Sequence, residues 1–162
     1  MTTGKGLADS RPAPDRESLA GQNPLRPAGR TRALRALTPD ECFDLLEPGG
    51  IGRVGFTAAD GIMMLPVNFA VAGKTIIFRT APDTLLALYA NRQLSFEADR
   101  LDETLREGWS VLVHGRAHEV NEEREVDHLE RKVALEPWAA GARDVYVRIT
   151  PIRITGRRIQ PA

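Results

Sequence analysis

The stretch "IGRVGFTAADGIMMLPVNFAVAGKTIIFRT", residues 51–80, alternates apolar side chains with polar or small ones over most of its length. A period of two is typical of β-strands, in which successive side chains point to opposite faces of a sheet. Turn-forming residues interrupt the alternation at Ala59-Asp60-Gly61 and at Gly73. The stretch therefore predicts three consecutive strands that pair as an antiparallel meander.

Three helices are predicted around this meander. The first begins after Thr38, because Thr38 and Glu41 have the spacing of a capping box. The second follows Pro82, where apolar residues recur at helical spacing. The third covers residues 121–135, with Asn121 as its predicted cap and an apolar face.

Further strands are predicted after the meander. They are a short run at residues 94–99, a long run at 109–120 behind an acidic loop, and two segments around Pro151. Strands outnumber helices and mostly follow one another in hairpin-like order. The predicted fold class is therefore mainly β (α+β), an antiparallel β-barrel with packed helices.

Composition predicts one folded domain preceded by a tail. A chain of 162 residues with 42% hydrophobic content can bury one substantial core. Residues 1–36 contain four prolines and leucines without period, which is typical of a segment that cannot bury enough apolar surface to fold. We therefore expect a disordered Pro/Arg-rich tail at 1–36 and the folded domain at 37–162.

Charge and targeting signals narrow the classes of function. Lys plus Arg equals Asp plus Glu at 22 each, so no excess charge favours nucleic acid or an anionic membrane. The chain has neither a secretory pattern near its start nor an apolar run of the ~20 residues that cross a bilayer. We expect a soluble cytoplasmic protein, and Cys42, the single cysteine, is interpreted as a packing residue.

Two apparent motifs are rejected on their context. Gly50, Gly52 and Gly55 spell the dinucleotide fingerprint G-x-G-x-x-G, but they open a predicted strand where that fingerprint must open a helix. His114 and His118 are four apart on a predicted strand, which separates them by roughly 13 Å at the usual rise. Neither a Rossmann site nor a metal site is therefore expected.

Five segments in order carry a resemblance to a known family: "LTPDECFDLLEPGGIGRVGF", "LPVNFAVAGKTIIFRTAP", "FEAD", "GWSVLVHGRA" and "PWAAGARDVYVRITPIRITGRRI". Together they resemble the pyridoxamine 5'-phosphate oxidase-like split-barrel proteins that bind flavin. The resemblance runs from about Thr38 to Ile159. It implies a six-stranded split barrel that forms a homodimer, with one FMN in each of two equivalent clefts at the interface.

The resemblance also implies which residues hold the cofactor. It places Val67, Asn68 and Phe69 on the strand that lies along the isoalloxazine ring. Arg79 and Thr80 would lie where the next strand meets the phosphate, and Thr84 would lie in the phosphate loop. Trp109 and Ser110 would face the same cleft.

One segment departs from the family pattern. The family usually reads Ala-Pro-Gly-Thr-Lys where this chain has Asp83 in place of the Gly and Leu85 in place of the phosphate-binding Lys. An added carboxylate and a lost cation both oppose binding of a phosphate. Arg79 either points into the cleft and replaces the Lys or points to solvent, and the sequence leaves both alternatives open.

Three functions remain open at this stage. The first is an FMN-dependent oxidoreductase, in which the flavin performs the redox chemistry. The second is an FMN carrier or sensor, and the third is a cofactor-free dimeric barrel. A deazaflavin could also replace FMN, and the sequence names no substrate. Apolar residues such as Met63, Met64 and Leu65 exceed what one small barrel needs inside, which favours the homodimer.

Overall fold

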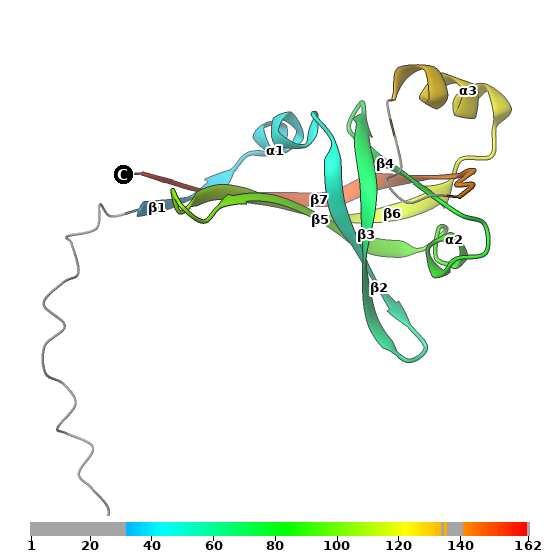
Figure 1. Ribbon diagram of the computed structural model, residues 1–162, viewed down its shortest axis with the longest axis horizontal. Coiled ribbons are helices and arrows are strands. Elements are labelled where there is room, and N and C mark those ends of the chain that lie inside the picture. Colours follow the sequence, from blue (N-terminus) through cyan, green and yellow to red (C-terminus); the bar gives the residue numbers. More distant parts are fainter. Residues whose placement is uncertain (1–31, 134, 136–140, 162) are drawn as a thin grey trace, which may run out of the picture. The chain divides into compact units, whose positions relative to one another are not determined.

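The computed structural model describes residues 32–133, 135 and 141–161 (Figure 1). Strands dominate it, and they follow one another in antiparallel pairs. In chain order the elements are β1 (Arg32–Leu37), α1 (Pro39–Leu46), β2 (Gly50–Ala58), β3 (Gly61–Ala72), β4 (Thr75–Thr80), α2 (Leu85–Leu88), β5 (Gln93–Asp102), β6 (Glu107–Glu119), α3 (Glu123–Lys132) and β7 (Val145–Pro161).

Six of these strands close into a ring. The sheet order is β1-β7-β4-β3-β2-β5-β6, and β6 pairs with β7 as well, so that β2 to β7 have neighbours on both sides. The β2–β5 contact is short, only Arg53–Gly55 against Ser95–Glu97, and it leaves the ring partly open. The predicted mainly β, six-stranded split barrel with flanking helices is confirmed.

Strand β1 lies outside this ring and inside the segment that the sequence assigned to the tail. It pairs with the far end of β7 from Arg32↔Pro161 to Leu37↔Gly156. The local sequence of residues 32–37 does not indicate a strand. The strand forms by pairing with a segment more than a hundred residues later, which a local pattern does not show. The folded part thus begins five residues before the expected boundary at 37, and residues 1–31 of the predicted tail lie outside the described residues.

The two predicted segments around Pro151 form the single strand β7. The strand continues past Pro151 through a bulge, because the β6–β7 register shifts between His114↔Arg153 and Gly115↔Pro151. Proline is tolerated at bulges because one ladder position there is left unpaired. The first part of β7, from Val145 to Ile149, also pairs with β4. This pairing places the segment before β7 next to the end of β4.

The barrel interior holds the main core. Phe78, Phe96 and Val113 are fully buried there, and α1 adds Cys42 and Leu46. Helix α1 begins as predicted, with Thr38 and Glu41 exchanging the two hydrogen bonds of a capping box. The packing role of Cys42 is confirmed by its complete burial, which also raises the pKa of its thiol.

Helix α3 covers a second, smaller core on the outer face of the sheet. Leu129 of α3 packs there with Ile77 of β4 and Tyr146 of β7. The predicted cap at Asn121 is wrong, because the helix begins one residue later with Glu122 as a cap that makes no side-chain hydrogen bond. Figure 1 shows α1 and α3 flanking the sheet at separate places.

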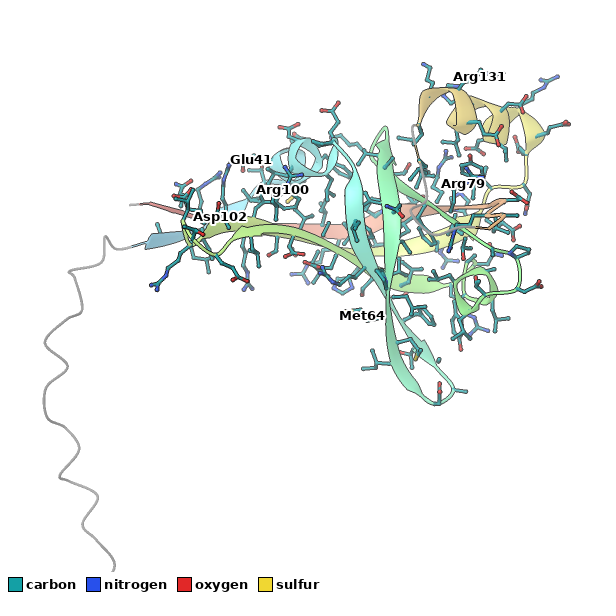
Figure 2. The ribbon with its side chains drawn as sticks, viewed as in Figure 1. Glu41, Met64, Arg79, Arg100, Asp102 and Arg131 are labelled. Atoms are coloured by element: carbon teal, nitrogen blue, oxygen red, sulfur yellow. The ribbon has the colours of Figure 1, made fainter. Side chains whose placement is uncertain are left out.

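The tip of the β2–β3 hairpin extends beyond its neighbours. β3 pairs with β2 from Phe69 to Gly61, but with β4 only through Phe69–Ala72. Figure 1 shows the tip projecting away from the other strands, and Figure 2 shows Met64 on this hairpin. Ile62 and Met64 are 83% and 62% exposed. The hairpin thus presents unpaired edges and apolar side chains among the described residues.

The described residues contain neither a membrane-spanning helix nor a metal-binding cluster. No helix there is long and apolar enough to cross a membrane. No three His, Cys, Asp or Glu side chains in the described ranges are grouped so that they could hold a metal ion. The Nδ1 atom of His114 lies 2.9 Å from the Oγ atom of Ser95, within hydrogen-bond distance. His118 pairs with Arg148 on β7.

Candidate functional site

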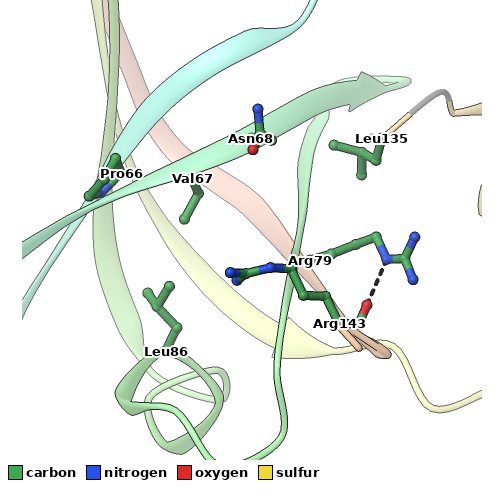
Figure 3. A pocket seen from close by; sticks show the side chains of 7 residues that line it. All are labelled: Pro66, Val67, Asn68, Arg79, Leu86, Leu135 and Arg143. Carbon is green, nitrogen blue, oxygen red and sulfur yellow. Dashed lines mark hydrogen bonds between the residues drawn. The ribbon is translucent and has the colours of Figure 1, made fainter. Parts of the chain in front are cut away.

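A pocket of about 90 Å³ lies beside β3 (Figure 3). It is bounded by β3, the end of β4, α2 and the segment before β7. We call it the cationic pocket; its described lining residues are Pro66, Val67, Asn68, Arg79, Leu86, Leu135 and Arg143. Three of the residues that the resemblance assigned to the cofactor, Val67, Asn68 and Arg79, are therefore brought together.

Strand register creates the pocket. The last β3–β4 pair is Phe69↔Phe78, so Pro66, Val67 and Asn68 run on past the end of the ladder. Beyond Thr80 the chain turns away into the loop before α2, which leaves this edge of β3 without a neighbouring strand in the described residues. Proline suits such an edge because it has no N–H to leave unpaired.

Arg79 is held at the back of the pocket. Its Nε donates a hydrogen bond of 2.7 Å to the backbone carbonyl of Arg143, and its Nη2 lies 3.9 Å from Asp144 Oδ1. The guanidinium also lies over the ring of Tyr146, 4.8 Å from its centroid. Burial raises the pKa of the Tyr146 hydroxyl, and the charge of Arg79 opposes that shift. Arg79 lines the pocket with a side chain that is 23% exposed, so it does not simply point to solvent, and its role as a substitute for the missing Lys stays a prediction.

Arg143 lies in the irregular segment before β7 and lines the same pocket. Figure 3 shows its guanidinium pointing toward the side of Val67 and Leu86, while that of Arg79 points the opposite way. Its Nε is buried and has no hydrogen-bond partner among the described residues. Sequence reasoning did not single out Arg143, because no period or motif marks a lone arginine in an irregular segment.

Thr80 and Thr84 form the loop between β4 and α2. The two hydroxyl oxygens are 2.7 Å apart, and Thr80 is 1% exposed. Thr84 Oγ1 donates to the Ala81 carbonyl at 2.9 Å and accepts from the Ala87 N–H at 3.3 Å, which caps α2. Since a hydroxyl has one hydrogen and two lone pairs, Thr80 must donate to Thr84, and the Thr84 hydroxyl is then fully used inside the loop.

A second hollow lies on the other part of this loop. We call it the acidic hollow; its described lining residues are Pro82, Asp83, Thr84, Leu85, Ala87, Leu88, Glu119 and Val145. Asp83 and Glu119 bring two carboxylates, and no lysine or arginine is among these residues. The phosphate-loop position Thr84 therefore faces an acidic hollow, while Arg79 faces the cationic pocket.

Phe69 occupies a different place from its two neighbours on β3. Its side chain is 4% exposed and packs edge-on against Phe96 in the barrel core, with the ring centroids 4.9 Å apart. Only its backbone belongs to the strand that passes the pocket. Within one chain, its side chain acts as a core residue beneath the site.

Trp109 and Ser110 are not brought to the cationic pocket. Trp109 lies opposite Arg100 on β5 and Arg158 on β7, and it lines a separate hollow at that end of the sheet. Figure 2 shows Arg100 at the opposite end of the sheet from Arg79. Ser110 is the next residue along β6 and pairs with Arg157. The predicted cofactor residues thus lie at two opposite ends of the sheet within one copy of the protein.

Comparison with known proteins identifies the family. The sequence profile of the family described as pyridoxamine 5'-phosphate oxidase matches residues 38–158. The solved FAD binding protein of Mycobacterium smegmatis has 37% sequence identity and a TM-score of 0.64, covering 76% of this chain and 96% of that chain. The protein of unknown function DIP1874 of Corynebacterium diphtheriae has 27% identity and a TM-score of 0.65, covering 78% and 98%.

A curated relative agrees in extent. The uncharacterized protein Rv0080 of Mycobacterium tuberculosis is 36% identical over 134 residues, which cover 79% of this chain and 87% of the relative. The family profile includes the barrel strands β2 to β6, most of β7 and the lining of the cationic pocket. The chain therefore belongs to the pyridoxamine 5'-phosphate oxidase family.

Proposed function

We propose that the chain binds a flavin nucleotide in the cationic pocket and uses it as the redox cofactor of an oxidoreductase. The observation that carries this proposal is that one pocket combines apolar side chains, Pro66, Val67, Leu86 and Leu135, with the two cations Arg79 and Arg143. A flavin nucleotide combines the matching groups, because an apolar ring system is joined to an anionic phosphate. The family, and a similar protein named for FAD binding, support the choice of a flavin.

The residues of the pocket fit this role. A bound flavin supplies the electron or hydride transfer. Pro66, Val67 and Leu86 present apolar surface to the ring and exclude water from it, while the two arginines attract the anionic end. No Asp, Glu or His is among the described residues of this lining. A mechanism in which the cofactor carries the chemistry therefore agrees with the site better than one that needs a side-chain acid or base.

FMN is the flavin that the sequence resemblance implies, and we propose it as the ligand. FAD is the flavin in the name of the M. smegmatis protein, and it carries the same FMN unit joined to a further nucleotide. A deazaflavin shares the ring shape and a phosphorylated side chain. Titration with all three ligands and with riboflavin, which lacks the phosphate, distinguishes them.

A second copy of the chain completes the cleft in this proposal. Pockets for ligands of this size usually enclose roughly 300–1,000 Å³, and the cationic pocket of one chain encloses about 90 Å³. Trp109 and Ser110 could reach the flavin only from another copy, since they lie at the other end of this one. The exposed Ile62 and Met64 on the hairpin next to the pocket supply apolar surface for that contact.

The decisive experiment is a visible absorption spectrum of the purified protein, followed by release of the ligand and its identification by mass. We expect flavin bands, or saturable quenching of flavin fluorescence when FMN is added to ligand-free protein. Light scattering should give twice the mass of one chain. If no flavin, including the deazaflavin, binds at up to about 100 μM, a range far weaker than specific binding, the cofactor-free barrel becomes the better account.

The same preparation separates an oxidoreductase from a carrier or sensor. Anaerobic mixing with NADH or NADPH should reduce the bound flavin faster than free flavin if the protein positions it for hydride transfer. A carrier would bind the flavin and leave this rate unchanged or lower. The amount of bound flavin, measured in the same sample, keeps this result independent of affinity.

A further inference from the structure

We infer that Arg143 provides the cation that binds the flavin phosphate, in place of a residue at the start of α2. The inference rests on the proposed function and specifies the part of the cofactor that this side chain recognises. It differs from the sequence expectation, which placed the phosphate near Arg79, Thr80 and Thr84 and considered only Arg79 as a substitute for the missing Lys.

The two hollows differ in charge. The start of α2 faces Asp83 and Glu119, and Leu85 brings no cation. A dianionic phosphate there would meet two carboxylates, which repel it. Helix α2 has only four residues, Leu85–Leu88, so its dipole offers little compensation. The cationic pocket has two arginines and no carboxylate among its described residues.

The two arginines of the cationic pocket differ in their hydrogen bonds. Arg79 already donates to the Arg143 carbonyl and packs on Tyr146, so its Nε is committed. Arg143 has no ion pair in the described part of the chain, and its buried Nε has no hydrogen-bond partner there. Leaving a buried charged donor unpaired is costly, whereas a guanidinium matches two oxygens of a phosphate in a fork geometry. Within the described residues Arg143 thus has none of its N–H donors committed, whereas Arg79 has committed its Nε.

A comparison with Arg148 shows that this state is specific. Arg148 also has a buried Nε without a partner, but its Nη1 is paired with the carboxylate of Glu125. The charge of Arg148 is therefore balanced inside the protein. That of Arg143 faces a pocket whose other described lining residues include no acid.

Arg79 holds Arg143 in position. The hydrogen bond from Arg79 holds the backbone of Arg143 two residues before β7, and the β4–β7 ladder pairs Arg79 with Tyr146. Arg79 is then a positioning residue, which directs the Arg143 side chain toward Val67 and Leu86 (Figure 3). The strand that the resemblance places along the flavin ring is the one that Arg143 faces.

The test compares FMN with riboflavin in four proteins: wild type, Arg143→Gln, Arg143→Lys and Arg153→Gln. Arg153 is an exposed arginine of β7 outside both hollows and serves as the matched control. Dissociation constants are measured by flavin fluorescence, and thermal melting of each protein reports its folding.

We expect Arg143→Gln to weaken FMN by about ten- to a hundredfold, as for loss of a charged hydrogen-bond pair. Arg143→Lys keeps the charge without the fork, and its loss should be smaller. The affinity for riboflavin should stay within about twofold of the wild-type value in all four proteins, because riboflavin carries no phosphate charge for the arginine to attract. The Arg153→Gln control should bind both ligands as the wild type does.

Equal losses for FMN and riboflavin in folded Arg143→Gln would overturn the inference, since Arg143 would then act through packing alone. Unchanged FMN affinity in Arg143→Gln or a full loss in Arg143→Lys would overturn it as well. Failure of the proposed function looks different, because the wild type would then bind neither flavin.

Discussion

Segment 79–88 contributes to two hollows that differ in charge. The cationic pocket takes Arg79 from its start, and the acidic hollow takes Asp83 and Thr84 from its middle. The opposite charges are completed by residues from elsewhere, namely Arg143 before β7 and Glu119 at the end of β6. The charge around a loop that resembles a phosphate site in sequence therefore depends also on residues that are distant in sequence and close in space.

A cation that is missing from a motif can be replaced by one from a distant part of the sequence. Leu85 removes a positive charge from the start of α2, and Arg143 places one about sixty residues later in the sequence beside the same β3 strand. The Thr80 and Thr84 hydroxyls are hydrogen-bonded to each other, and Thr84 also donates to the Ala81 carbonyl, so both side chains hold the loop between the two hollows.

Placing a carboxylate at residue 143 should have the largest effect. Arg143→Glu removes the cation proposed to bind the phosphate and puts a negative charge in its place, with Arg79 as the remaining cation of the described lining, so FMN affinity should fall by more than about a hundredfold. Riboflavin should bind nearly as it does to the wild type. Fluorescence titration of both ligands measures this contrast, and a parallel loss of riboflavin would mean that the ring, and not the phosphate, contacts residue 143.

Removing the group that positions Arg143 should come next. Arg79→Met loses the hydrogen bond to the Arg143 carbonyl and the contact with Tyr146, so the free energy of unfolding should fall by about 2 kcal/mol. Both flavins should bind more weakly, FMN more than riboflavin. Urea denaturation checks the stability, with Arg53→Met as a control for loss of a largely exposed arginine. Full stability in Arg79→Met would remove the positioning role.

Removing the hydrogen bond between Thr80 and Thr84, in the loop between the two hollows, should have a smaller effect on stability. Thr80→Val keeps the shape of the buried side chain but removes the hydrogen bond to Thr84, which should lower the unfolding free energy by about 1 kcal/mol. Thr80→Ser retains the hydroxyl and separates that effect from the loss of a methyl group. A drop in FMN affinity without a matching drop for riboflavin would indicate that the Thr80 hydroxyl itself binds phosphate.

The smallest effect is expected in the acidic hollow. Asp83→Gly together with Leu85→Lys restores the usual family residues at the start of α2. If the phosphate is bound by Arg143, FMN affinity should improve by less than about threefold, the size of a long-range charge effect. A tightening of about tenfold or more with no change for riboflavin would return the phosphate to the start of α2.

Much of the fold follows from local sequence signals. The alternation over residues 51–80 predicts β2, β3 and β4, and the capping box of Thr38 and Glu41 predicts α1, because each signal acts within a few residues. Pairing with distant segments was not visible. Strand β1 depends on the end of β7, and the passage of β7 through Pro151 depends on a bulge against β6.

The site was predicted in the same uneven way. The family resemblance grouped Val67, Asn68 and Arg79, and the structure places all three in the lining of one pocket, while their contact with a cofactor stays a prediction. Arg143 could not be assigned, since only the β4–β7 pairing brings the segment before β7 to the pocket. Whether Trp109 and Ser110 share the cleft depends on a second copy, which remains a prediction.

The most direct test of the account is a crystal structure of the protein with FMN bound. We predict that a phosphate oxygen lies within about 3 Å of the Arg143 guanidinium, the usual length of a charge-assisted hydrogen bond, with Arg79 still bonded to the Arg143 carbonyl. A phosphate seated on Thr84 and the start of α2, with the Arg143 side chain turned away, would contradict the account.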